Sequence, residues 1–409
     1  MYYWSLAISL LFSAPAFAAP SSYHVLFPSK TALATYIVYL ENDPLSKRIA
    51  NYYAVQHKID SANLLSIPAP ANVSSITAAD FNVWYEKVLK KTAVSSNKQF
   101  LLTFPQPYRV GCMSITAAFA FGYDESFCSE KTCDLTAKNP YYGSLNNTVL
   151  KEKRLYPTMM LAANNFDQAK ALIDRGVAAQ NNWPQGQAYL VETSDQARSA
   201  RKVIYPDVKQ LDKLLPVNIL QTEGIKDKND ILFYFTGAVS VPYLSTLGFE
   251  PGAVADHLTS AGGQLTDSSQ MSAMRWLEAG ATGSYGTVVE PCNHLAKFPD
   301  PRMLMYFYTK GNTLMEAYWK SVLMPGEGVF IGDPLARPFG GYRVTEGKKN
   351  VVLRTYSLMP GIYRIEVAES VLGPFRKTRF MFKAEDGKVT FRLPKFKSPV
   401  VRLNIEPIL

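Results

Sequence analysis

The chain has 409 residues, of which 47% are hydrophobic and 12% aromatic. This composition excludes a disordered chain, and the length exceeds what one hydrophobic core usually supports, so we expect two or three domains. The formal net charge of +9 is concentrated near the end, because residues 340–409 hold 14 Lys and Arg against 6 Asp and Glu. No nucleic-acid-binding motif accompanies this charge, so the sequence predicts no nucleic-acid partner.

The N-terminal segment is typical of a secretory signal. Residues 2–18 form an apolar stretch that ends in Ala16-Phe17-Ala18, and we expect cleavage after Ala18. The stretch is too short to cross a bilayer as a helix, and no second hydrophobic span follows it. The sequence therefore predicts a signal peptide at 1–18 and a secreted or periplasmic protein that does not span a membrane.

Strand and helix patterns alternate through most of the chain. Buried-strand patterns occupy residues 34–43, 63–68, 99–104, 158–163, 187–192, 217–222, 231–236, 283–289 and 328–333. Helical spacing of apolar residues occupies 46–57, 79–91, 166–179, 197–215, 253–260, 272–279 and 313–322. Because such alternation is the signature of a parallel sheet, the sequence predicts an α/β body.

Two segments depart from this alternation. Residues 105–150 form an excursion with Tyr, Gly and Cys, and a loop of that length inside a compact domain is usually functional or fastened by disulfides. Beyond Pro338 the apolar period changes to two, and Asp386-Gly387 between two strand patterns predicts a β-hairpin. The tail is therefore expected to be a small antiparallel β domain.

The expected organisation has four parts. They are a signal peptide at 1–18, an N-terminal α/β subdomain at 19–225, a C-terminal α/β subdomain at 226–339 and a basic β domain at 340–409. The basic domain is suited to an anionic partner such as envelope lipid or an acidic polysaccharide. A solvated basic face with no specific partner is the favoured alternative.

Four cysteines are present, at Cys112, Cys128, Cys133 and Cys292. An even count in an oxidising compartment predicts two disulfide bonds. Cys128 and Cys133 are close enough in sequence to close a small loop, which leaves Cys112 and Cys292 to pair or to stay free. Three pairings are possible, and the sequence does not choose among them.

The run from residue 231 to residue 338 is the candidate functional region. Gly-rich turns or acidic residues follow several of its strands, and an open α/β sheet places its binding crevice at such strand ends. The crevice residues expected there are Thr236, Gly237, Glu290, His294 and Asp333. No base lies beside Thr236 in sequence, so we interpret Thr236-Gly237 as a structural turn.

Cys292, His257 and Asp256 form the candidate catalytic set in this region. A thiolate nucleophile needs a nearby imidazole, and the imidazole needs an orienting carboxylate. These three residues meet those needs if the fold brings them together. A disulfide at Cys292 would remove the option, and that structural role is the favoured alternative in an exported protein.

The same region also contains candidate residues for metal and phosphate binding. Asp256, His257, Glu290, His294 and Asp333 include suitable metal ligands. Glu290 and His294 have i, i+4 spacing, but Pro291 disfavours a helix there, so the spacing does not indicate a helical zinc site. The glycine runs at 262–263 and 280–283 lack the Lys-Ser/Thr of a P-loop. The sequence predicts no metal and no cofactor.

Several segments between residues 35 and 340 carry a family resemblance. They are YRVGCMSIT, MMLAA, LIDRGVAA, FTGAVSVP, ADHLTS, WLEAGATGSYGTVVEPC and GDPLARP. Together they resemble an uncharacterised family of exported bacterial proteins found in genomes with exosortase-type (PEP-CTERM) protein sorting. The resemblance implies export and an association with sorting, and it brings no known activity.

The order of elements also resembles that of the gingipain-type cysteine peptidases, whose fold is caspase-like α/β. In such peptidases one buried strand ends in His-Gly, and a second ends in a small residue followed by the nucleophilic Cys. The corresponding positions here are Thr236-Gly237 and residues 255–263, which contain no Cys. The resemblance implies a caspase/gingipain-like parallel sheet flanked by helices, followed by a small antiparallel β-sandwich-like domain, with both members of the dyad missing.

Two functions from different classes follow. The first is a non-peptidase accessory protein of the cell envelope, linked to protein sorting or extracellular-matrix export. It rests on the missing dyad, the basic tail and the family resemblance. The second is a cysteine hydrolase with a rearranged site built from Cys292, His257 and Asp256. We favour the first, and the state of Cys292 discriminates between them.

Overall fold

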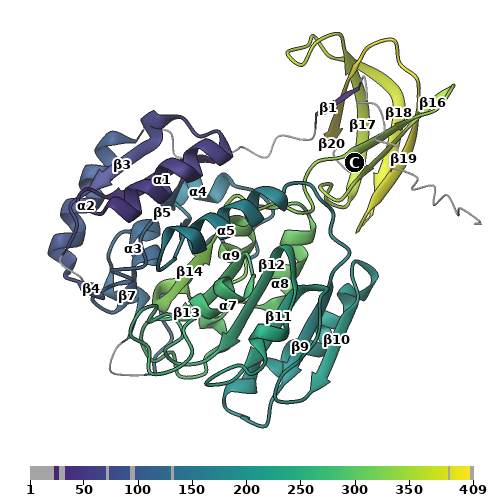
Figure 1. The fold of residues 1–409 in the computed structure, drawn as a ribbon. Coiled ribbons are helices and arrows are strands. Elements are labelled where there is room, and N and C mark those ends of the chain that lie inside the picture. Colours follow the sequence, from purple (N-terminus) through teal and green to yellow (C-terminus); the bar gives the residue numbers. More distant parts are fainter. Residues whose placement is uncertain are drawn as a thin grey trace, which may run out of the picture.

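The computed structural model describes residues 23–26, 33–70, 73–92, 97–129, 133–385 and 387–405. The expected signal peptide at 1–18 lies outside these ranges. The chain forms an α/β body, drawn from purple to green in Figure 1, and a smaller β domain drawn largely in yellow. The predicted α/β sheet flanked by helices is confirmed, and so are antiparallel strands in the C-terminal part.

Ten strands of the body form one continuous sheet. From edge to edge it contains β10 (Val217–Gln221), β9 (Gln187–Glu192), β11 (Ile231–Gly237), β12 (Phe249–Leu258), β13 (Gly283–Thr287), β14 (Gly328–Gly332), β8 (Thr158–Met160), β5 (Lys98–Leu102), β2 (Ala34–Leu40) and β3 (Leu64–Ile67). β13 and β14 are antiparallel, and the other neighbouring strands are parallel. The sheet therefore has two five-stranded blocks that point in opposite directions.

The division between these blocks differs from the predicted subdomain boundary at residues 225 and 226. β9 and β10 precede that boundary in sequence, yet both belong to the block that contains β11. The two blocks share one sheet, which is continuous through the β14–β8 pair. Because the blocks are antiparallel, the carboxyl ends of β9 to β13 lie at one end of the sheet, and those of the other block lie at the opposite end.

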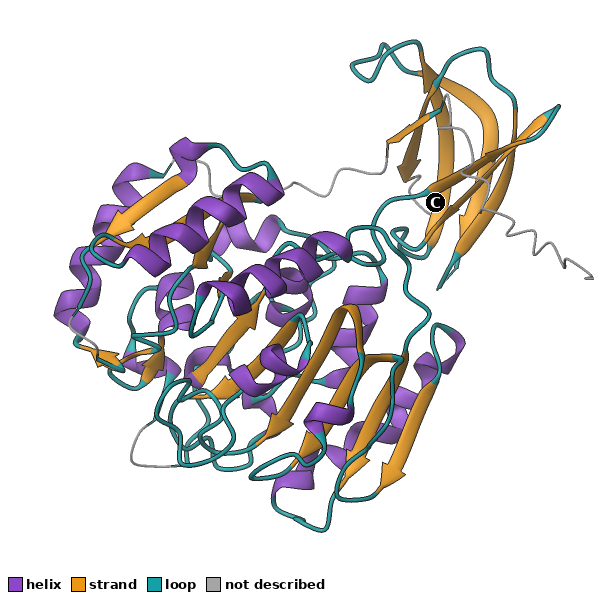
Figure 2. Ribbon diagram, in the orientation of Figure 1, coloured by secondary structure: helices purple, strands orange, loops and turns teal. Residues whose placement is uncertain are grey.

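Helices cover both faces of this sheet (Figure 2). The α-helices are α1 (Pro44–His57), α2 (Ala78–Lys91), α3 (Ile115–Phe121), α4 (Thr148–Lys153), α5 (Phe166–Ala178), α6 (Tyr205–Val208), α7 (Met274–Ala279), α8 (Pro301–Thr309) and α9 (Leu314–Trp319). Short 3₁₀ helices are η1 (Ser61–Asn63), η2 (Glu125–Phe127), η3 (Arg198–Ile204), η4 (Lys209–Lys213), η5 (Leu244–Thr246), η6 (Leu295–Lys297) and η7 (Pro325–Glu327). The helices predicted at 46–57, 79–91 and 166–179 are confirmed as α1, α2 and α5.

The sequence of α1 explains where this helix begins. The Asp43 side chain caps the N-terminus, because its Oδ1 accepts hydrogen bonds from the N–H of Leu45 at 2.9 Å and of Ser46 at 3.2 Å. Pro44 occupies the first turn, where its missing N–H costs no hydrogen bond. The helix ends at His57, and the C-cap residue Lys58 adopts a left-handed conformation.

Two predicted helices are wrong. Residues 253–260 were expected to be helical, but they belong largely to strand β12. β12 lies inside the sheet with helices on both faces, so residues 252–258 are all buried and show no alternation that would distinguish strand from helix. The long helix predicted at 197–215 is instead three short pieces, η3, α6 and η4, with Pro206 in the first turn of α6.

The excursion at 105–150 has secondary structure of its own. It contains β6 (Arg109–Val110) and β7 (Met113–Ser114), which form a small sheet with β4 (Ser75–Ile76), and it also contains α3, η2 and α4. A disulfide joins Cys112 to Cys128 within it, and a second joins Cys133 to Cys292. The two predicted disulfides are confirmed, but the pairings suggested by sequence proximity, Cys128 with Cys133 and Cys112 with Cys292, are wrong.

The β domain consists of two small sheets around one core. One sheet has the order β1 (His24–Leu26), β20 (Val400–Ile405), β17 (Gly361–Ala368), β18 (Arg376–Ala384), and the other β15 (Arg343–Glu346), β16 (Asn350–Thr355), β19 (Val389–Pro394). Side chains from both sheets, including Leu353, Ile365 and Leu403, form its hydrophobic core. Asp386 of the hairpin predicted at Asp386-Gly387 lies outside the described residues, but the strands on either side, β18 and β19, belong to different sheets, so the predicted pairing is wrong.

The N-terminal strand completes this C-terminal domain. β1 pairs in parallel with β20, although the sequence assigned residues 19–225 to the α/β body. The Tyr23 hydroxyl donates to the Phe396 carbonyl at 2.9 Å, and the Val25 N–H donates to the Tyr342 hydroxyl at 3.1 Å. Tyr23 and Val25 are both buried in the domain core. The β domain therefore depends on residues from both ends of the chain.

Candidate functional site

A crevice lies at the carboxyl ends of β11, β12 and β13. The loops that follow β12 and β13 and the start of η3 enclose a cavity of about 170 Å³. Its lining consists of Ala197, Arg198, Leu258, Thr259, Ser260, Glu290, Pro291, Cys292 and Asn293. This is the end of the sheet where the sequence places the crevice, and the predicted residues Glu290 and Cys292 contribute to its wall.

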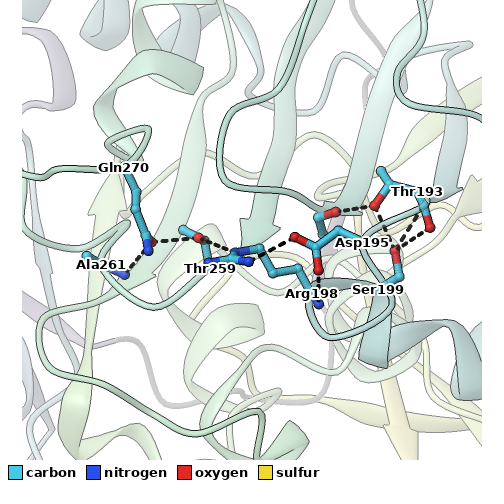
Figure 3. Close-up of polar contacts among 8 residues, drawn as sticks. Thr193, Asp195, Arg198, Ser199, Thr259, Ala261 and Gln270 are labelled. Carbon is cyan, nitrogen blue, oxygen red and sulfur yellow. Dashed lines mark hydrogen bonds and ion pairs between the residues drawn. The ribbon is translucent and has the colours of Figure 1, made fainter.

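Arg198 is the centre of a chain of hydrogen bonds across this crevice (Figure 3). Its Nη1 donates to Asp195 Oδ2 at 2.8 Å, and its Nε donates to Thr259 Oγ1 at 3.1 Å. The Thr259 hydroxyl donates to Gln270 Oε1 at 2.6 Å, and the same oxygen accepts from the N–H of Ala261 at 2.9 Å. These contacts fasten the loop after β12 to η3 and hold a cation in the cavity wall.

Asp195 remains charged beside Arg198. Burial alone would raise the pKa of this carboxyl, but hydrogen bonds from the backbone and side chain of Arg198 outweigh it, so the pKa lies below its ordinary value. Sequence reasoning missed this pair, because Asp195 lies in the loop before η3 and Arg198 at the start of η3, outside the run 231–338. The signal in the sequence is an acid and a base three residues apart just after a strand.

Close packing of η3 determines the end of β11. A Cβ atom at Gly237 would lie 1.9 Å from the backbone oxygen of Arg198, so no side chain fits there. The Thr193 hydroxyl donates to the Gly237 carbonyl at 2.6 Å, and the Thr193 N–H donates to Ser199 Oγ at 2.9 Å. Figure 3 shows these contacts beside Arg198. The Thr236-Gly237 step therefore packs η3 against the sheet.

His257 lies in the core, where it is 2% exposed. Its Nδ1 accepts a hydrogen bond from Trp276 Nε1 at 3.0 Å, so its Nε2 carries the proton and donates to the Met271 carbonyl at 3.1 Å. Burial lowers the pKa of the imidazole to about 3. The ring is therefore neutral at pH 7, and both of its nitrogens are occupied by core contacts.

Asp256 points to the other face of the sheet from His257, because successive side chains of a strand alternate. It forms a buried ion pair with Arg201, whose Nη2 also donates to the Thr236 carbonyl at 2.8 Å. Burial raises the pKa of the Asp256 carboxyl, and the guanidinium opposes that shift. Asp256 therefore does not orient the imidazole of His257, as the candidate catalytic set required.

Cys292 is bonded to Cys133, so its sulfur is not available as a thiolate. The N–H of Cys292 donates to Glu290 Oε1 at 2.9 Å, and His294 Nε2 contacts the Cys133 carbonyl at 2.7 Å. Glu290 and His294 thus stabilise the loop around the disulfide. The candidate set of Cys292, His257 and Asp256 is not assembled in this structure, which corrects the catalytic hypothesis.

Asp333 lies at the opposite end of the sheet from the crevice. It follows β14, which runs antiparallel to β13, so its N–H contacts Thr282 at the start of β13. Its carboxylate oxygens contact the Tyr53 hydroxyl at 2.8 Å and His57 Nε2 at 2.9 Å, both on α1. Asp333 therefore connects the end of β14 to α1 and is not a crevice residue.

The candidate metal ligands thus do not lie together at one site. Among the residues that the structure describes, no group of three or more His, Cys, Asp or Glu side chains is arranged to hold a metal ion. Within the same ranges, none of the helices combines the length and apolar character that a membrane crossing requires.

No family model matches the chain, and no curated protein matches it. A solved structure described as a protease is similar over 90% of this chain and 98% of its own length, with 9% sequence identity and a TM-score of 0.42.

Proposed function

We propose that this chain is an exported accessory protein of the cell envelope, linked to protein sorting or extracellular-matrix export. In this proposal the body has a caspase- or gingipain-like fold without peptidase activity. The segment resemblances described above support the association with sorting. The two disulfides support a place in an oxidising compartment outside the cytoplasm.

The chemistry at the ends of β11 and β12 carries this proposal. A gingipain-type peptidase needs His at the first position and a thiolate Cys at the second. Here the first position is Thr236, and the segment 255–263 at the second contains no Cys. All four cysteines form disulfides, and His257 is a neutral core residue. Neither the nucleophile nor the base of a gingipain-type peptidase is therefore present at these two positions.

The crevice is better suited to binding than to bond cleavage. Arg198 supplies a partly exposed guanidinium, and Thr259 and Ser260 line the same cavity. The acid across the cavity is Glu290. A polypeptide segment presents carbonyl acceptors and N–H donors that match such a mixed wall, and Arg198 is already held in place by Asp195.

A hydrolysis assay tests the absence of peptidase activity. The purified mature chain, with both disulfides formed, is incubated with mixed fluorogenic peptides with and without mild reductant, and we expect no turnover in either condition. Turnover that disappears in Cys292→Ser, but persists in the matched variant Cys112→Ser, would establish the cysteine hydrolase alternative instead.

A complementation experiment tests the accessory role. Deletion of the chain from its host should reduce the surface display or release of sorted proteins, and the wild-type chain should restore it. We expect Arg198→Ala to restore it poorly, because the crevice loses its cation. Arg302→Ala is the matched control, since that arginine also pairs with nearby carboxylates but lies outside the cavity. A deletion with no effect on any sorted protein would contradict the proposed function.

A further inference from the structure

The turn between β17 and β18 exposes two adjacent aliphatic side chains. Val371 is 52% exposed and Leu372 is 93% exposed. They are the central residues of a four-residue turn, because the Gly373 N–H donates to the Ser370 carbonyl at 3.1 Å. Turn centres usually carry glycine, proline or short polar residues, which favour the turn conformation, so two aliphatic residues there do not serve the turn itself.

The turn is held by its own hydrogen bonds and not by burial of its tip. The Ser370 hydroxyl donates to the Gly373 carbonyl at 3.0 Å, and Gly373 has a φ of 88°, a conformation that glycine adopts without strain. Behind the tip, the Arg402 guanidinium lies 3.8 Å from the centroid of the Phe375 ring. The two aliphatic side chains are therefore displayed on a fixed support.

Exposed cations surround the base of this turn. We define the basic collar as Arg376, Lys377 and Arg379 on β18 together with Lys397 on the loop before β20; all four are exposed. That loop lies beside β18, because Arg376 Nη2 donates to Ser398 Oγ at 3.4 Å. The collar thus places several positive charges next to the apolar tip.

The nearby carboxylates offset only part of this charge. Glu369 lies 3.7 Å from Arg376 and accepts a hydrogen bond from the Ser398 hydroxyl at 2.6 Å. Glu366, which is opposite Lys377 in the β17–β18 pair, already accepts from Arg402 Nε at 2.7 Å. The collar therefore keeps a net positive charge toward solvent.

We propose that this tip is a contact site for an anionic phospholipid bilayer. Val371 and Leu372 enter the boundary between headgroups and acyl chains, while the basic collar lies at the level of the lipid phosphates. An acidic polysaccharide could pair with the charges of the basic collar, but it has no apolar phase for the side chain of Leu372. The exposed aliphatic tip therefore indicates a bilayer. The inference deepens the proposed envelope role and rests on it for the presence of a membrane.

Sedimentation with lipid vesicles tests the inference on the full mature chain. We expect binding to phosphatidylcholine vesicles that contain about one third phosphatidylglycerol, and much weaker binding to pure phosphatidylcholine. The double substitution Val371→Ser with Leu372→Ser should weaken binding about tenfold or more, because two aliphatic groups no longer leave water. Lys377→Glu with Arg379→Glu should remove the preference for anionic vesicles.

Matched controls use surface residues of the body. Val55→Ser replaces another exposed aliphatic residue and Lys90→Glu another exposed cation, and both should bind as the wild type does. Leu372→Trp gives a second readout, since its fluorescence should shift to the blue with anionic vesicles and not with neutral ones. An unchanged thermal melt in each variant separates lost contact from lost fold.

Two outcomes would overturn the inference. One is a wild-type chain that binds no vesicles, which would leave the non-peptidase role standing, because that role is tested by hydrolysis and complementation. The other is vesicle binding that survives the serine substitutions and is displaced by soluble acidic polysaccharide, which would assign the collar to a polysaccharide and leave the tip without a role.

Discussion

Trp276 Nε1 donates a hydrogen bond to His257 Nδ1 at 3.0 Å, and this contact decides the role of the histidine. It fixes the tautomer, directs Nε2 to the Met271 carbonyl and keeps the ring in the core. A general base must accept a proton on a free ring nitrogen. Neither nitrogen of His257 is free, so this member of the candidate catalytic set is structural.

The pH dependence of stability should report this buried histidine. Its folded-state pKa of about 3 lies below the ordinary unfolded value of about 6.5, so the unfolded chain binds the proton more readily. Its contribution is therefore complete above about pH 6.5 and is lost as the pH falls toward 3, by an amount on the order of a few kcal/mol. The free energy of unfolding, measured with urea at several pH values between 7 and 4, should fall less steeply with falling pH for His257→Gln than for wild type or His294→Gln.

Removal of the Asp256 charge should destabilise the fold. Asp256→Asn leaves the guanidinium of Arg201, which is 1% exposed, without its counter-charge, and we expect a loss of about 3 to 5 kcal/mol in the free energy of unfolding. The double variant Asp256→Leu with Arg201→Met should lose much less, because no charge stays buried. Chemical denaturation measures both, and equal losses in the single and double variants would contradict the pairing.

The Cys133–Cys292 disulfide should contribute more stability than Cys112–Cys128. The first spans 159 residues and the second 16, so a chain-entropy argument predicts losses of about 5 and about 3 kcal/mol when each pair is changed to serine. Denaturant unfolding of the two double variants checks this order. A reversed order would mean that the loop around Cys292 holds its conformation without the bond.

The N-terminal strand should stabilise the C-terminal domain. Tyr23→Ala removes a buried ring and its hydrogen bond to Phe396, and we expect a loss of about 3 kcal/mol that is confined to the β domain. Val55→Ala on the exposed face of α1 is the control and should stay within about 0.5 kcal/mol of wild type. Calorimetry that showed no earlier unfolding step for Tyr23→Ala would contradict a structural role for β1.

The fold was largely predictable where local pattern is decisive. Helices such as α1 and α5 have one apolar face and clear capping residues, and most strands of the body are short apolar runs between turns. The run 253–260 was misassigned because both faces of β12 are buried, which erases the alternation that identifies a strand. The division of the body also escaped prediction, since β9 and β10 join strands that follow them in sequence.

The sequence predicted where the candidate site lies, but not which side chains meet there. As predicted, Thr236-Gly237 end β11 and Glu290 follows β13, at one end of the sheet. Asp333 follows a strand as well, but β14 runs the other way, so its carboxylate contacts Tyr53 and not the crevice. Strand direction depends on which neighbours pair, and no local sequence pattern records it.

The sequence by itself determined the α/β body, the period-two tail and the even number of cysteines, because burial and periodicity are local properties of the chain. Tertiary structure alone decided that Cys292 pairs with Cys133, that His257 packs against Trp276 and that β1 joins β20. Each of these contacts joins residues that are separated in the sequence. Packing of the whole chain decides which of them meet, and here it gives Cys292 and His257 structural contacts in place of the predicted catalytic ones.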